Sequence, residues 1–146
     1  MAQFHFSLER VMRWRSVEVA AERARLEVLV REQLRLQTQR AALIADKSKL
    51  DASLGTLPDL RGQDLRAATA FALRLKRQAD NLKELLARCE SEISVQRKKY
   101  QEAQRRFRLL EELRARRLAE WRYEQANELE SLASESYLAH WNRDRT

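Results

Sequence analysis

The chain contains very few residues that interrupt a helix, only two glycines and one proline in 146 residues. All three lie in one short window, at Gly55, Pro58 and Gly62. Glycine and proline are the strongest local helix breakers. The sequence therefore predicts a single reversal of the chain, with an uninterrupted helix on each side of it.

The expected ends of the two helices follow from residues that cap helices. Ser7 is suited to begin the first helix, because its hydroxyl can accept a bond from a free backbone N–H. Asp64 is suited to cap the second helix in the same way. We expect the first helix at about residues 8–54, the turn at about 55–64 and the second helix at about 64–140.

Cysteine and long apolar runs are equally scarce. The single cysteine, Cys89, excludes an internal disulfide and favours a reducing compartment. No apolar run approaches the roughly 20 residues that a membrane span needs. The first residues lack the basic and then apolar pattern of a signal peptide. These absences predict a soluble, cytoplasmic protein without a transmembrane segment.

The sequence also lacks the residues from which active sites and metal centres are built. His5 and His140 have no second Cys or His three or four residues away, so no zinc site is expected. We expect Cys89 to be a small buried hydrophobic residue rather than a nucleophile, because no histidine lies near it in sequence. Two glycines form neither a phosphate-binding loop nor a dinucleotide-binding turn. We therefore predict no catalytic residue, no metal, no cofactor and no enzymatic activity.

What the sequence has in abundance is Leu, Ala, Glu, Arg and Gln, and 35% of its residues are charged. This composition is typical of long helices and coiled coils. Residues 65–110 keep an apolar seam with heptad spacing, which only Gln96 interrupts, and such a seam predicts a coiled coil. The seam consists of Leu65, Ala68, Ala72, Leu75, Ala79, Leu82, Leu86, Cys89, Ile93, Tyr100, Ala103, Phe107 and Leu110.

The apolar spacing changes after Phe107 and is mixed in the first helix. Beyond Phe107 apolar residues recur every eleven residues, which straightens or reverses a supercoil and predicts different packing there. In the first helix we expect two series to share one broad apolar face. The series with seven-residue spacing is Leu29, Leu36, Leu43, Leu50 and Leu57, and the series with eleven-residue spacing is Val19, Val30, Ala41 and Ala52.

The short link between two helices with apolar seams predicts an all-α antiparallel hairpin that forms one domain over residues 1–146. A reversal near residues 59–60 places residue i opposite residue 119 − i, so that Leu8 lies near Glu111. About 30 residues of the second helix then overhang the first. Uncovered apolar surface of this kind marks an interface. The overhang carries Trp121, Tyr123, Leu129, Leu132, Tyr137 and Trp141.

Charge is unevenly distributed in this basic chain, which has a net charge of +7. Residues 97–122 form a basic band, whereas the residues from 123 onward are mainly acidic. The band can lie along nucleic-acid phosphates, be a solvated helix face, or contact an acidic protein. Because exposed aromatic residues adjoin it, we favour docking to a protein and expect no nucleic acid. A nucleic-acid-associated or ribosome-associated coiled coil is the alternative.

Both ends of the chain resemble one protein family. Residues 4–11, Phe-His-Phe-Ser-Leu-Glu-Arg-Val, followed by Arg15 and Glu18, resemble the start of the flagellar export protein FliJ family. Residues 121–133 resemble the C-terminal region of that family. The resemblance extends over nearly the whole chain, because length, charge and the single turn agree. Two departures are Glu130-Ser131, where the family has a Leu-Asp-Glu-like step, and Pro58 in the turn.

The resemblance implies a cytoplasmic, stalk-like component of the bacterial flagellar type III protein export apparatus, which serves motility and chemotaxis. Such proteins resemble the central stalk of rotary ATPases and lie peripherally at the inner-membrane base of the flagellum, held there by their partners. The implied partners are the export ATPase hexamer, whose assembly and activity they promote, the cytoplasmic linker of the export gate, and export chaperones. The equivalent stalk of a virulence-type secretion system fits the same residues.

The resemblance also implies two sets of contact residues. For the export gate, the matching positions are Gln39, Leu43, Phe71 and Leu75. Leu43 and Leu75 also lie in the apolar seams, so packing in the core is the stronger interpretation for them, whereas Phe71 is off the seam and is expected to be exposed. For the ATPase ring, the overhang supplies Arg114, Arg117, Trp121, Glu124, Glu128, Leu129 and Leu132.

Overall fold

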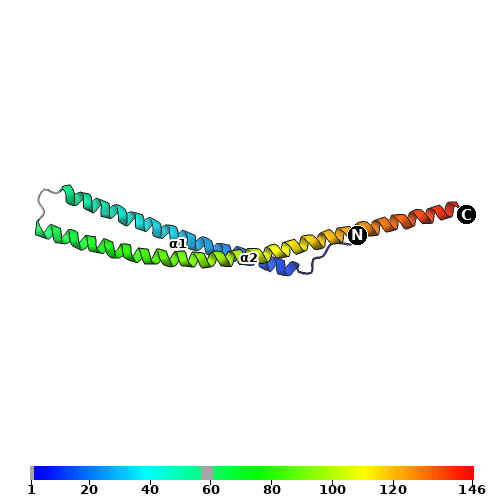
Figure 1. The fold of residues 1–146 in the computed structure, drawn as a ribbon, viewed down its shortest axis with the longest axis horizontal. Coiled ribbons are helices and arrows are strands. Elements are labelled where there is room, and N and C mark those ends of the chain that lie inside the picture. Colours follow the sequence, from blue (N-terminus) through cyan, green and yellow to red (C-terminus); the bar gives the residue numbers. More distant parts are fainter. Residues whose placement is uncertain (1, 57–60) are drawn as a thin grey trace. The chain divides into compact units, whose positions relative to one another are not determined.

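The computed structural model describes residues 2–56 and 61–146 and places nearly all of them in two helices (Figure 1). Helix α1 spans Glu9–Thr56 and helix α2 spans Gly62–Asp144, with 48 and 83 residues. Residues 2–56 and 61–146 contain no strand. The prediction of an all-α hairpin with a longer second helix is confirmed.

The helix ends differ slightly from those expected from the sequence. Gly55 lies inside α1 and Gly62 is the first residue of α2, although both were expected in the turn. Glycine weakens a helix interior more than a helix end, so both glycines are tolerated here. Leu57 and Pro58, which the sequence assigned to the seam and the turn, lie outside the described residues.

The two residues expected to cap the helices, Ser7 and Asp64, do not do so through their side chains. The backbone carbonyl of Leu8 accepts the hydrogen bond from the N–H of Met12 that opens α1, at 2.9 Å. Among the described residues, neither Ser7 nor Asp64 caps a helix through a side-chain hydrogen bond. Asp64 lies within the first turn of α2. Its negative charge there stabilises the positive end of the helix dipole.

The described residues form two compact units, and each helix contributes to both. The first unit joins the chain up to Val19 with Glu102–Thr146, and the second unit is Ala20–Gln101. The boundary on α2 lies shortly before Phe107, where the sequence changes from seven-residue to eleven-residue spacing.

In the second unit, α1 and α2 lie side by side and run antiparallel (Figure 1). The thiol of Cys89 donates a hydrogen bond to the carbonyl of Leu29 at 3.5 Å, and Gln96 contacts Glu22. Both pairs are within one residue of the pairing predicted from the turn. The core consists of Leu36, Leu82, Leu86, Cys89 and Ile93, with Leu26, Leu29 and Leu43 packed against it.

The seam of α2 is confirmed over its middle, where every buried residue occupies a predicted seam position. Towards the turn Leu75 is buried and Ala68 is half-buried, as predicted, but the prediction is wrong for Leu65, Ala72 and Ala79, which are exposed. The short side chains of Ala72 and Ala79 leave space between the helices there. In α1 the seven-residue series is confirmed over its described residues, Leu29 to Leu50. In the eleven-residue series Val19 is half-buried, but Val30 is exposed, so that series is wrong beyond Val19. Ala41 and Ala52 are exposed as well.

Gln96, the one polar residue in the seam, is buried, and its side-chain NH2 group is hydrogen-bonded to α1. Its side-chain amide donates a hydrogen bond to the backbone carbonyl of Glu22 at 3.1 Å and another to the Glu22 carboxylate. The same carboxylate accepts a bond from Arg25 at 2.7 Å. A satisfied polar layer of this kind costs stability relative to an apolar pair but fixes the register of two helices.

Candidate docking surfaces

The second unit contains an open groove between its two helices. The groove has a volume of about 670 Å³. Its lining includes apolar side chains such as Leu43 and Leu75. The charged side chains that line it are mainly basic: Arg40, Lys47, Lys76 and Lys83, with Asp51 and Asp80. The groove lies where the alanines of the α2 seam leave space between the helices, so it follows directly from the sequence of the seam.

The four residues implied for the export gate do not share one environment. Leu75 is only 6% exposed, and Leu43 packs against the core, so both act mainly in packing, as predicted. Phe71 is 41% exposed, as its position off the seam predicted. Gln39 is exposed too, and neither Gln39 nor Phe71 lines the groove. Whether the four bind a gate linker stays a prediction.

In the first unit, residues 2–8 form an N-terminal segment that precedes α1 and packs along α2. The ring of Phe4 lies 6.0 Å from the ring of Trp121, tilted by 55°, and Phe6 is buried. The guanidinium of Arg114 lies over the Phe4 ring at 5.6 Å and pairs with Glu9 at 3.4 Å. The prediction that Trp121 has no intramolecular cover is therefore wrong.

The reach of the N-terminal segment explains this error. Extended chain advances about 3.3 Å per residue, against 1.5 Å in a helix, so a few non-helical residues extend far along α2. The pair of Glu9 with Arg114 also lies about one helical turn further along α2 than the pairing predicted for Leu8 and Glu111. The alternating aromatic residues Phe4 and Phe6 are the sequence signal that the prediction missed.

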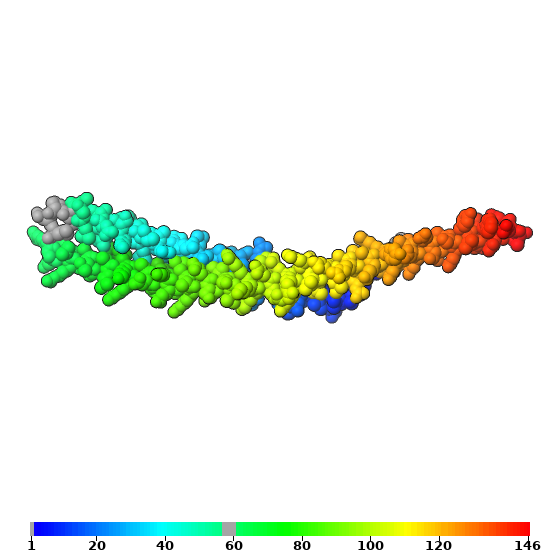
Figure 2. Space-filling view, in the orientation of Figure 1, coloured from blue at the N-terminus to red at the C-terminus, as the bar shows by residue number. Residues whose placement is uncertain are grey.

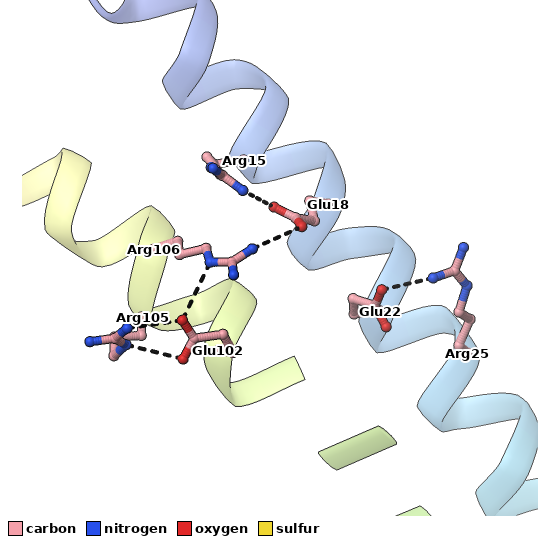
Figure 3. A network of polar contacts seen from close by, with 7 residues as sticks. All are labelled: Arg15, Glu18, Glu22, Arg25, Glu102, Arg105 and Arg106. Atoms are coloured by element: carbon pink, nitrogen blue, oxygen red, sulfur yellow. Dashed lines mark hydrogen bonds and ion pairs between the residues drawn. The ribbon is translucent and has the colours of Figure 1, made fainter. Parts of the chain in front are cut away.

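In the same unit, a network of ion pairs joins α1 to α2 through Arg106 (Figure 3). Glu18 accepts from Arg15 at 2.9 Å and lies 3.7 Å from Arg106 of α2. Arg106 also contacts Glu102, which pairs with Arg105 at 2.9 Å. The hydrogen bond from Arg105 lowers the pKa of the Glu102 carboxyl and keeps it ionised. Such partly exposed pairs contribute little energy individually but orient the helices.

Beyond Trp121, every side chain of α2 except the half-buried Gln125 is exposed. We call residues 122–144 the tip. Among the described residues, no hydrogen bond, ion pair or ring contact joins the tip to α1 or to the N-terminal segment. On the face shown in Figure 2, no other segment lies over the orange and red part of α2. The exposed apolar residues predicted there are confirmed: Tyr123, Leu129, Leu132, Tyr137 and Trp141.

The residues implied for the ATPase ring are distributed over two environments. Arg114 and Trp121 are half-buried against the N-terminal segment, whereas Arg117 is exposed and lies 4.0 Å from Glu120. The remaining four are exposed on the tip: Glu124, Glu128, Leu129 and Leu132. In the basic band, Arg108, Arg116 and Arg122 form no ion pair with any described residue, so their charge is available to a partner.

The described residues hold no group of three or more Cys, His, Asp or Glu side chains suited to bind a metal ion. Cys89 is buried, as predicted. Burial raises the pKa of its thiol, and the nearby Glu92 carboxylate raises it further. Because a nucleophilic cysteine needs a lowered pKa, this environment is that of a structural residue.

Comparison of the chain with protein-family models, curated proteins and solved structures found no match. Neither described helix combines the length and the hydropathy needed to cross a membrane. The candidate surfaces are therefore defined by the chain itself: the groove of the second unit, the tip of the first unit, and the basic band over residues 97–122 of α2.

Proposed function

We propose that this chain is a stalk-like coiled coil of a bacterial type III export apparatus, with the tip of α2 as its contact with the export ATPase ring. The sequence resemblance at both ends of the chain supports the proposal. The observation that carries it is the uncovered tip, because a soluble helix rarely leaves so much apolar surface without a partner. The protein acts in the cytoplasm, by binding rather than by catalysis.

The contact with the ring uses one side of the tip. Leu129 and Leu132 are 67% and 61% exposed. They continue the side of α2 on which Trp121 lies, because Leu129 and Leu132 follow Trp121 by eight and eleven residues, spacings that keep side chains on one broad helix face. Acidic Glu124 and Glu128 flank these leucines, and the basic Arg114 and Arg117 precede them. Apolar anchors surrounded by charge are suited to a groove between subunits, with the charges adjusting the rate of binding.

The second unit is proposed to bind the cytoplasmic linker of the export gate. Its apolar groove beside Leu43 and Leu75 is bordered by lysines and has room for apolar side chains of a linker. The exposed ring of Phe71 offers an additional anchor on α2. Basic groove edges favour an acidic, amphipathic segment, which is also the chemistry expected of an export chaperone helix.

Binding of nucleic acid by the basic band is the second candidate. The unpaired guanidinium groups of Arg108, Arg116 and Arg122 support it, because free arginines bind phosphates and displace counterions. Affinity of this kind falls steeply as salt rises, whereas apolar docking of the tip does not.

The test compares binding of an export ATPase by three full-length forms of the chain. The double variant Leu129→Asp/Leu132→Asp places charge on the proposed contact, and we expect it to lose binding. Leu138→Asp is the matched control, because Leu138 is 54% exposed on the same tip but lies on another side of the helix. Equal loss in both variants, or no loss in either, contradicts the proposal. Tighter binding to heparin than to the ATPase at moderate salt favours the nucleic-acid candidate.

A further inference from the structure

A second face of α2 in the first unit is also free of cover, on the side away from Trp121. Successive helix residues are rotated by about 100°, so Tyr123 and Leu132 lie on opposite sides of the helix. Arg116, Tyr123, Glu130 and Tyr137 recur at seven-residue spacing and follow the Tyr123 side. Arg108 lies at the edge of the same side. We call this the outer face, defined by Arg108, Arg116, Tyr123, Glu130 and Tyr137.

The outer face is solvent-exposed and its charges are unused. Tyr123 and Tyr137 are 69% and 71% exposed, among the highest values of any large apolar residue in the chain. Arg116 and Glu130 form no ion pair with any other residue in the described part of the chain. The N-terminal segment packs on the other side of α2, around Trp121, and so does not block this face.

The charges on the outer face are complementary to those of a second outer face that runs in the opposite direction. Arg116 and Glu130 lie seven residues on either side of Tyr123. Arg108 and Tyr137 lie fifteen residues before and fourteen after it. In an antiparallel pair of outer faces that meet at Tyr123, each Arg116 therefore lies against Glu130 of the other copy. Each Arg108 lies against the ring of Tyr137 of the other copy.

We propose that the outer face binds a second copy of this chain, with the two α2 helices antiparallel and related by a two-fold axis at Tyr123. Two-fold pairing is the commonest symmetry of soluble oligomers, and it makes every contact occur twice. The contacts are two Arg116–Glu130 ion pairs, two Arg108–Tyr137 cation–π contacts and one central pair of Tyr123 rings. Residues 108–137 span about 45 Å of helix, and the small, exposed Ala119 and Ala126 let the helices approach closely.

A second copy fits this face better than a partner that carries charge of one sign. An acidic partner would meet Glu112 and Glu130, and a basic partner would meet Arg108 and Arg116, whereas a second copy pairs Arg116 with Glu130 twice. The pairing leaves Leu129 and Leu132 on other sides of the helix. It therefore does not depend on the proposed contact with an ATPase ring.

The test is a charge swap in the full chain, with the association state measured by sedimentation at several protein concentrations. We expect the unmodified chain to form a dimer, and Arg116→Glu or Glu130→Arg to weaken it about tenfold or more, because each creates two like-charge contacts. The double variant Arg116→Glu/Glu130→Arg restores opposite charges and should restore the dimer. Arg117→Glu, an equal change of charge away from the outer face, should leave it intact.

Cross-linking supplies a readout that does not depend on the charge variants. In a Cys89→Ala background, Tyr123→Cys should form a disulfide-linked dimer on mild oxidation, because the two-fold axis places residue 123 beside its counterpart. Leu132→Cys, on the opposite side of the helix, should not. A chain that stays monomeric at all concentrations overturns the proposal, as does a double variant that fails to restore the dimer. Equal cross-linking at both positions overturns it as well.

Discussion

Single side chains determine where this chain is rigid and where it is available to a partner. Leu82 and Phe71 lie on the same helix, but Leu82 packs in the core of the second unit while Phe71 stays exposed. The difference arises from one property of the sequence, the position of each residue in the heptad. The seam position of Leu82 buries its side chain between the helices, and the off-seam position of Phe71 leaves its ring exposed to solvent.

We expect Leu82→Ala to lower the free energy of unfolding by about 2–5 kcal/mol, because it leaves a cavity in the core. Phe71→Ala should lower it by less than about 1 kcal/mol, as substitutions of exposed residues usually do. Urea unfolding followed by circular dichroism measures both values. If both substitutions cost the same, Phe71 belongs to the core and its assignment as a contact residue fails.

Cys89 gives the protein a pH dependence of known sign. Burial raises the pKa of this thiol above the ordinary value of 9.0, so the folded chain resists ionisation that the unfolded chain allows. Well below pH 9.0 the thiol is neutral in both states and has no effect on stability. As the pH rises through 9.0, the thiol ionises in the unfolded chain but not yet in the folded chain. The unfolded state is thereby favoured, and the free energy of unfolding falls.

We therefore predict that the unmodified chain loses stability above pH 9.0 more steeply than a Cys89→Ala variant does. Thermal unfolding of the two proteins across this pH range measures the difference. The thiol should also react slowly with a disulfide reagent until denaturant is added, because it is buried. Rapid reaction in the folded protein would contradict the burial of Cys89.

At the scale of the elements, Gln96 and the N-terminal segment hold α1 and α2 in place by different means. Gln96 forms a polar layer in the seam and binds the backbone of Glu22. The N-terminal segment is held by side-chain packing of Phe4 and Phe6, and Glu9 is joined to the carbonyl of Phe6 by one backbone hydrogen bond of 3.2 Å. Gln96 sets which residues of α1 and α2 face one another, and the N-terminal segment covers Trp121.

We expect Gln96→Leu to raise the melting temperature, because it replaces a polar layer by an apolar one that fits the seam. Gln96→Ala should lower it, since the amide and its hydrogen bonds are lost and no packing replaces them. Thermal unfolding of the two variants beside the unmodified chain measures both effects. An equal decrease in the melting temperature of both variants would show that the hydrogen bonds of the Gln96 amide stabilise the two helices more than apolar packing at this position does.

We expect Phe4→Ala to expose Trp121 without unfolding the helices. The lost ring pair is worth about 0.5–1.5 kcal/mol beyond its buried area, too little to unfold α2. In a Trp14→Phe/Trp141→Phe background, the fluorescence of Trp121 should become more accessible to a soluble quencher. Phe71→Ala is the control and should leave quenching unchanged. Unchanged quenching in Phe4→Ala would mean that Phe4 does not cover Trp121.

At the scale of the whole molecule, the sequence predicted most of the fold because one strong signal dominated it. The clustering of Gly55, Pro58 and Gly62 located the reversal, and the heptad seam located the buried face of α2. The N-terminal segment escaped prediction, because Phe4 and Phe6 precede the helix and carry no helical period. The groove escaped it as well, since an apolar pattern counts Ala72 and Leu75 alike although their side chains differ greatly in length.

The candidate surfaces were less predictable than the fold for a related reason. The apolar periodicity of the sequence identifies which side chains lie outside the core between the helices, but not which other segment covers them. It therefore placed Trp121 with Leu129 and Leu132 on one exposed stripe, whereas the N-terminal segment divides this stripe at Trp121. The exposed part begins with the tip, and the functional proposal rests on that part.

The central claim, that the tip of α2 is the contact through which this chain acts, is tested most directly by ATP turnover. The export ATPase is assayed alone, with the full chain, and with a chain that ends after Arg122 and so keeps the cover of Trp121 intact. Circular dichroism and thermal unfolding establish that the shortened chain keeps its helices. The account predicts that the full chain stimulates turnover and that the folded, shortened chain does not. Equal stimulation by both would contradict it.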